Sequence, residues 1–150
     1  MSGNSADTGG GVYGDGLTTI TNSTISNNSA RLGGGSFLSG TSTITNVTVS
    51  GNTSNSVGGG IFAHGIVTLI SSTVSGNTAI GLGGGINNDG TTTLVNSTVS
   101  GNSAASGGGV YNSDSLDLAH STVASNTATT GAGGITSISD LVLRNTILEI

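Results

Sequence analysis

The residues of this sequence that could do acid–base chemistry are few. There are seven carboxylates and two histidines, against two arginines and no cysteine. Asp15, His64 and Asp89 fall at one position of a repeat of 24 or 25 residues, and Asp114 lies one position further along its own repeat. Such a set could form a weak metal site or an acid–base patch. Asp beside Gly is equally typical of a polar turn, which is the interpretation we favour.

The known routes to catalysis each lack a component. Glycoside hydrolysis needs two carboxylates at a defined separation, and a lyase acting on an acidic substrate would want a base beside a cation. The two arginines, Arg31 and Arg144, lie far apart in the sequence. The Gly-rich segments lack the Lys and the following helix of a phosphate loop. We therefore expect no enzyme activity, no cofactor and no metal.

Charge and hydropathy limit the kinds of partner that the chain can bind. The formal net charge is −5, whereas binding to nucleic acid needs a basic surface. No segment approaches the roughly 20 apolar residues of a membrane-spanning helix, and the first residues do not resemble a signal peptide. The sequence predicts no nucleic-acid partner and no membrane insertion.

A repeat organises the whole chain. A Gly-Gly-Gly triplet recurs at 9–11, 33–35, 58–60, 83–85 and 107–109, with a degenerate copy at 131–134. Each is followed by one anchor residue, and the anchors are 24 or 25 residues apart: Val12, Ser36, Ile61, Ile86, Val110 and Ile135. Such a period indicates a solenoid built from one supersecondary unit per repeat.

Aliphatic columns define the interior of this solenoid. Residues eight and thirteen positions after the anchor are all Ile, Leu or Val, and Ser36 is the exception among the anchors. Three such columns predict three short strands per coil. A leucine-rich repeat would need a Leu-rich consensus and helical segments, which are missing. The sequence therefore predicts one all-β domain over residues 1–150: a three-sided parallel β-helix of about six coils, right-handed by the crossover rule.

Two asparagine columns follow the same period. We expect the first to form a structural ladder of stacked side-chain amides at a bend; it contains Asn22, Asn46, Asn96 and Asn145, with Ser71 and His120 in the remaining coils. The second runs from Asn4 to Asn126 and predicts a tight turn, as do the Gly triplets, because Asn and Gly tolerate a left-handed backbone.

Hydroxyl side chains form the most regular outward columns. The candidate surface-binding ladder consists of Thr24, Thr48, Thr73, Thr98 and Thr122, with Ser26, Ser50, Ser75 and Ser100 two residues further on. A second column on the preceding face reads Thr19, Thr43, Thr68, Thr93 and Asp117. Such columns could order water on ice or lie along a crystalline polysaccharide. They also fit the high strand propensity of Thr alone.

The repeat unit resembles a known group. Gly83 to Ile86 with Asn96 to Asn102, and Gly58 to Ile61 with Ser71 to Asn77, resemble the right-handed parallel β-helix repeats of bacterial surface and secreted proteins. These include the polymorphic outer-membrane-protein repeats of adhesins and autotransporter passengers. The resemblance implies a structural or adhesive module at the cell surface or outside the cell, and a polysaccharide lyase or hydrolase relative is a further alternative.

The ends of the repeat suggest a partner. Solenoids usually protect their ends with atypical capping repeats, and the sequence shows none. It opens on Ser2-Gly3-Asn4 and closes at nearly the same phase, on Glu149 and Ile150. Exposed strand edges are templates for pairing. We expect a segment of a longer assembly or a unit that stacks end to end into filaments.

Overall fold

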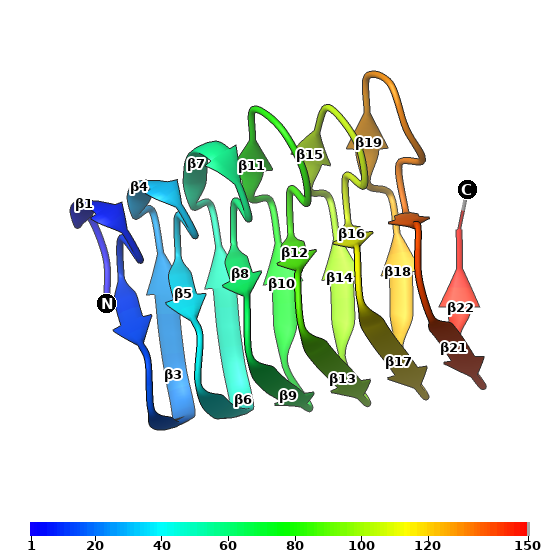
Figure 1. Cartoon of the computed structure of the whole chain (residues 1–150), viewed down its shortest axis with the longest axis horizontal. Coiled ribbons are helices and arrows are strands. Elements are labelled where there is room, and N and C mark those ends of the chain that lie inside the picture. The colour runs from blue at the N-terminus through cyan, green and yellow to red at the C-terminus, as the bar shows by residue number, and fades with distance from the viewer. Residues whose placement is uncertain (150) are drawn as a thin grey trace.

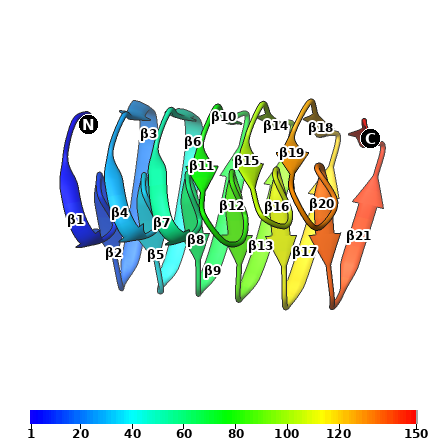
Figure 2. The same ribbon diagram turned by 90° about the horizontal axis from the view of Figure 1, so that it is seen from above.

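The chain folds into a column of stacked coils. The computed structural model describes residues 1–149, which contain strands and turns but no helix. Figures 1 and 2 show the strands of successive coils lying side by side from one end to the other. Neighbouring strands pair in parallel with the residue one repeat away, so that Val74 lies between Val49 and Val99. The predicted parallel β-solenoid of about six coils is confirmed.

Three parallel sheets run along the solenoid. The first sheet has six strands: β1 (Ser5–Thr8), β4 (Ser29–Leu32), β7 (Thr53–Val57), β11 (Thr78–Ala79), β15 (Ser103–Ala104) and β19 (Thr127–Ala128). The second sheet also has six: β2 (Val12–Gly14), β5 (Ser36–Leu38), β8 (Ile61–Ala63), β12 (Ile86–Asn88), β16 (Val110–Asn112) and β20 (Ile135–Ser137).

The third sheet has ten strands and is bent into two faces. In the first two coils, β3 (Leu17–Ser26) and β6 (Thr41–Ser50) run through the bend as single strands. In the later coils the bend interrupts the strand. The first face then continues through β9 (Ile66–Ile70), β13 (Thr91–Val95), β17 (Ser115–Ala119) and β21 (Leu141–Arg144). The second face continues through β10 (Thr73–Ser75), β14 (Thr98–Ser100), β18 (Thr122–Ala124) and β22 (Ile147–Leu148).

The predicted aliphatic columns fill the interior. Ile44, Leu69 and Leu94 are completely buried, as are Val49, Val74 and Val99 in the next column. Each such side chain packs on its counterparts in the adjacent coils and contributes about 1.5–3 kcal/mol relative to an exposed position. Ser36 is equally buried in the anchor column, and its hydroxyl has no hydrogen-bond partner within the described residues.

The interior also contains polar residues that the aliphatic pattern did not predict. Ser72, Ser97 and Ser121 are buried near the bend, and the hydroxyl of each accepts a hydrogen bond from a backbone N–H of the preceding coil at 3.1 to 3.2 Å. On the second sheet, Asn88 donates to the Asn112 side chain at 2.6 Å. Their polar atoms are paired along the solenoid axis, so the residues can be buried at low cost.

The Gly triplets form the turn between the first and second sheets. The first glycine of a triplet has a positive φ, as at Gly83 (φ 63°). The second lies against two backbones: a Cβ at Gly84 would lie 2.4 Å from the Ser103 carbonyl oxygen and 2.5 Å from that of Gly108. The predicted turn with close backbone approach is confirmed, and its cause is the distance between successive coils.

Candidate functional site

The threonine and serine columns lie on the outside of the second face of the third sheet. Thr48, Thr73 and Thr98 are neighbours on β6, β10 and β14, and Ser50, Ser75 and Ser100 run parallel to them. Between the two columns lie the buried Val49, Val74 and Val99, as alternation along a strand requires. The hydroxyls are exposed or half-buried and repeat at about 4.8 Å along the axis. The result is a regular hydroxyl surface across five coils.

The first face of the third sheet is less uniform. Its threonine column runs in register from Thr68 to Thr93 and then meets Asp117. The Asp117 carboxylate accepts hydrogen bonds from Arg144 Nη1 at 2.7 and 3.0 Å. The ion pair interrupts the hydroxyl surface on this face, which makes the second face the better candidate for a repetitive ligand.

The predicted ladder column of Asn22, Asn46, Asn96 and Asn145 has a second structural requirement, which is its backbone conformation. These residues lie at the bend of the third sheet, they are exposed, and their φ angles are 45° to 54°. The side chain of Asn46 donates to that of Asn22 at 2.7 Å, but Ser71 and His120 interrupt the column with the same positive φ. The requirement here is for a left-handed backbone, which Asn tolerates better than most residues.

The continuous amide ladder is in the other asparagine column, between the third sheet and the first. Asn28, Asn52, Asn77 and Asn102 are buried. The side-chain oxygen of Asn77 accepts from both the backbone N–H and the side-chain amide of Asn52, each at 2.9 Å. The Asn77 amide in turn donates to the carbonyl of Val49 at 3.0 Å. The positive φ that we predicted for this column falls on the preceding residue, as at Gly76 (φ 62°).

His64 and Asp89 are the one predicted acid–base pair that the structure brings together. His64 Nδ1 lies 3.0 Å from Asp89 Oδ2, and Ser113 Oγ lies 3.3 Å from Asp89 Oδ1. Asp15 and Asp114 are exposed on other coils. Within residues 1–149 no group of three or more His, Cys, Asp or Glu could hold a metal ion.

An aromatic column beside His64 was missed from the sequence. Tyr13, Phe37 and Phe62 follow the anchors of the first three coils and point outward from the second sheet. The Tyr13 and Phe37 rings are stacked with centroids 5.4 Å apart, and Phe62 meets Phe37 edge-on at 5.1 Å. A signal was available, since the four aromatic residues of the chain, including Tyr111, all stand one residue after an anchor.

The other arginine, Arg31, forms an ion pair with Asp7 on the first sheet. Arg31 donates from Nε to Asp7 Oδ1 at 2.9 Å, one coil away. This hydrogen bond lowers the pKa of Asp7 below its ordinary value. The pair is exposed, so it is screened by solvent and contributes little to stability.

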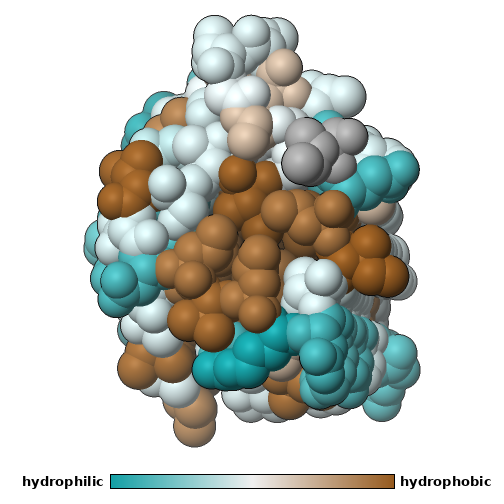
Figure 3. All heavy atoms as spheres, turned by 90° about the vertical axis from the view of Figure 1, so that its right-hand side faces the viewer, coloured by the Kyte–Doolittle hydropathy of each residue, from teal (hydrophilic) through white to brown (hydrophobic). Residues whose placement is uncertain are grey.

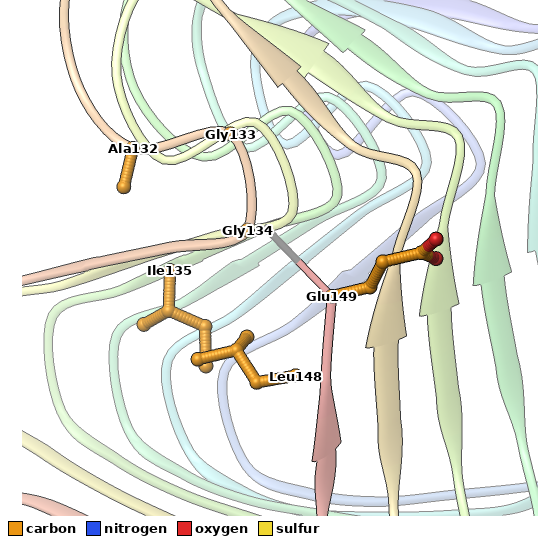
Figure 4. A pocket seen from close by; sticks show the side chains of 6 residues that line it. All are labelled: Ala132, Gly133, Gly134, Ile135, Leu148 and Glu149. Carbon is orange, nitrogen blue, oxygen red and sulfur yellow. The ribbon is translucent and has the colours of Figure 1, made fainter.

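The end of the solenoid that carries β21 and β22 is apolar. Figure 3 shows a hydrophobic patch at its centre with hydrophilic atoms around it. Val142, Leu143 and Leu148 are 40% to 42% exposed, and Ile147 is 65% exposed. A shallow hollow in this end is lined by Ala132, Gly133, Gly134, Ile135, Leu148 and Glu149 (Figure 4). Within residues 1–149, no further strand pairs with the outer edges of β21 and β22, and this end has an apolar centre.

The described part of the chain has no helix long and apolar enough to cross a membrane.

Comparison with known proteins supports the repeat assignment. Residues 46–64 match the model of the Chlamydia polymorphic membrane protein repeat. They run from the bend of the second coil, through Asn52 of the ladder and a Gly triplet, to His64. No curated protein and no solved structure matches the chain. The match indicates a bacterial surface protein, and with the observed fold it makes the chain a parallel β-solenoid protein that resembles the polymorphic membrane protein repeats.

Proposed function

We propose that the chain is a non-catalytic structural and adhesive module of a bacterial cell surface. The match of residues 46–64 to a repeat of polymorphic membrane proteins carries the proposal. The geometry supports it because most repeated residues already have a structural role: the aliphatic columns fill the core and the buried asparagines pair the coils. What remains for function is the outer surface and the ends.

Binding of the purified chain to cells tests the adhesive part. We expect fluorescently labelled chain to bind cultured epithelial cells saturably, and an excess of unlabelled chain to displace it in flow cytometry. Binding that never saturates, or that unlabelled chain leaves unchanged, would contradict adhesion. Release of reducing ends from a polysaccharide panel would contradict the non-catalytic part.

A second candidate function is binding of ice or a crystalline polysaccharide through the second face of the third sheet. The supporting observation is the register of Thr48, Thr73 and Thr98 beside a parallel serine column. The double change Thr73→Lys and Thr98→Lys would place bulky charges in this surface. It should abolish inhibition of ice recrystallisation or pull-down on cellulose. The same change at Thr68 and Thr93, on the other face, is the matched control. Lack of activity in the unchanged chain would refute this candidate.

End-to-end stacking is a further variant of the structural role. Each sheet begins at one end of the solenoid with β1, β2 or β3 and finishes at the other with β19, β20, β21 or β22. A second copy could therefore continue all three sheets by parallel pairing and cover the apolar end. Such a head-to-tail contact does not close and would form filaments.

The first three residues make the stacking hypothesis testable. Ser2 pairs with Ser26, and the amino group of Met1 donates to the Thr24 carbonyl at 2.7 Å. The segment lies on the edge of β3 where β22 of an incoming copy would pair. Deleting residues 1–3 should increase filament formation in electron microscopy, and Leu143→Lys should prevent it. Ile66→Lys, which alters an exposed apolar residue on the side of the solenoid, is the control. Monodisperse monomer at high concentration in both the full chain and the deletion variant would refute stacking.

A further inference from the structure

The aromatic cluster on the second sheet is a feature that the repeat does not require. Tyr13, Phe37 and Phe62 occupy an outward position at which the later coils have Asn87, Tyr111 and Thr136. Asn87 and Thr136 show that the fold does not require an aromatic residue there. Tyr13 is 57% exposed. The three rings extend over two coil spacings, roughly 10 Å, which is the scale of a small ligand.

His64 joins these rings to a polar group. Its ring centroid lies 6.3 Å from that of Phe37 and 5.9 Å from that of Phe62. Because the Asp89 carboxylate accepts the hydrogen bond from Nδ1 at 3.0 Å, the neutral imidazole presents Nε2 as an acceptor. The side chains of His64 and Asp89 remain about half exposed, at 53% and 48%.

One more acceptor adjoins the rings. Asn87 pairs with Phe62 across the neighbouring strand and is only 6% exposed. Its side-chain oxygen has no hydrogen-bond partner among the described residues. A buried acceptor without a donor costs free energy, and a ligand hydroxyl could satisfy it only if the Asn87 side chain turned outward.

The charges of the surroundings restrict the ligand. The guanidinium groups of Arg31 and Arg144 already pair with Asp7 and Asp117, and the net charge is −5. An acidic ligand would therefore find repulsion. Both oxygens of Asp89 already accept hydrogen bonds, from His64 and Ser113, so a cationic ligand would have to displace one of these donors to reach the carboxylate. A peptide strand could not add to this part of the sheet, since β5 is paired on both sides.

We propose that Tyr13, Phe37 and His64, with the largely buried Phe62 packed behind them, bind a neutral saccharide. The apolar C–H groups of a sugar ring pack against aromatic rings, while its hydroxyls donate to acceptors such as His64 Nε2 and accept from donors such as the Tyr13 hydroxyl. Ligand sites commonly combine an aromatic lining with a few polar groups in this way. The proposal deepens the adhesive role proposed above by naming its ligand class.

Proton NMR of the full chain with lactose, maltose, cellobiose and chitobiose tests this site. The chain has two tyrosines, two phenylalanines and two histidines, so the ring signals can be assigned individually. We expect at least one sugar to shift the Tyr13 and His64 signals and to receive saturation transfer from the aromatic protons. Tyr13→Ala and His64→Asn should each weaken binding by roughly tenfold or more, as loss of a central aromatic contact does elsewhere.

Matched controls separate this site from the other surfaces. His120→Asn places in the bend column the residue found there in other coils, and should leave the affinity unchanged. The Thr73→Lys and Thr98→Lys variant should also bind the sugar normally. Ring shifts with arginine or choline but with none of the sugars would overturn the proposal in favour of a cation site. An absence of shifts at the solubility limit of every sugar would overturn it as well. Cell binding that persists in Tyr13→Ala would then leave the adhesive function standing.

Discussion

Two columns of asparagine run along this solenoid with the same period and different roles. In the ladder of Asn28, Asn52, Asn77 and Asn102 the side chains are buried, and each amide bridges to the next coil. In the bend column of Asn22, Asn46, Asn96 and Asn145 the side chains are exposed and the backbone has a positive φ. The ladder uses the hydrogen-bonding capacity of asparagine, and the bend uses its conformational tolerance.

The two columns differ in whether other residues replace asparagine. The bend takes Ser71 and His120 without losing its backbone conformation. The ladder has asparagine at each of its six positions from Asn4 to Asn126. A buried amide that bonds to two neighbouring coils has no equivalent among the other side chains of similar size. A column in which other residues replace asparagine therefore indicates a requirement for backbone conformation, and a column without replacements indicates a requirement for the side-chain amide.

The largest effect should come from breaking the ladder. Asn77→Ala removes the acceptor of the Asn52 N–H and amide, and the donor to the Val49 carbonyl. We expect the free energy of unfolding to fall by roughly 3–4 kcal/mol, because several buried groups lose their partners. Urea denaturation followed by circular dichroism measures it. A loss no larger than that of a bend substitution would contradict the distinction between the columns.

A buried polar residue without partners should behave in the opposite way. Ser36 lies in the aliphatic anchor column, completely buried, and its hydroxyl is unpaired in the described structure. Ser36→Val removes that hydroxyl and adds apolar volume between coils one and three. We expect a gain of about 1–2 kcal/mol in the free energy of unfolding. Thr92→Val is the control, since the Thr92 hydroxyl donates to Asn88 at 2.7 Å and its loss should destabilise. A less stable Ser36→Val chain would show that the site has no room for the methyl groups.

The fold and the site differ in how much of each could be predicted from the sequence. The period and the aliphatic columns were enough for the solenoid, its coils and most of its core, because parallel pairing stacks like residues on like. They could not distinguish the two asparagine columns, since spacing carries no information about which turn faces inward. For the same reason, nothing in the spacing marked Ser72, Ser97 and Ser121 as buried. The His64–Asp89 contact followed from the column, whereas the aromatic rings around it needed their outward direction to be known.

The bend column should respond to backbone conformation alone. Asn96 has a φ of 50°. Asn96→Ala should cost about 1 kcal/mol because a Cβ disfavours this region and Ala lacks the local hydrogen bonding of Asn. Asn96→Gly should change the free energy of unfolding by less than about 0.5 kcal/mol. The two variants are compared by the same denaturation experiment. Equal losses in both would mean that the Asn96 side chain itself stabilises the bend.

The smallest effect should come from the exposed cross-coil pair of Asp7 and Arg31. The hydrogen bond from Arg31 lowers the pKa of Asp7 below its ordinary value of 3.8. The pair therefore stabilises the fold above about pH 4, and this contribution is lost as the pH falls through the lower pKa of the folded state. Both side chains are exposed, at 55% for Arg31 and 71% for Asp7, so water screens the attraction. We expect Asp7→Asn to leave the midpoint of urea unfolding at pH 7 almost unchanged. Asn77→Ala should lose the same stability at pH 7 and pH 3, since amides do not titrate. A large pH-dependent loss in Asp7→Asn would mean that charge, and not the buried amide ladder, is the main polar link between the coils.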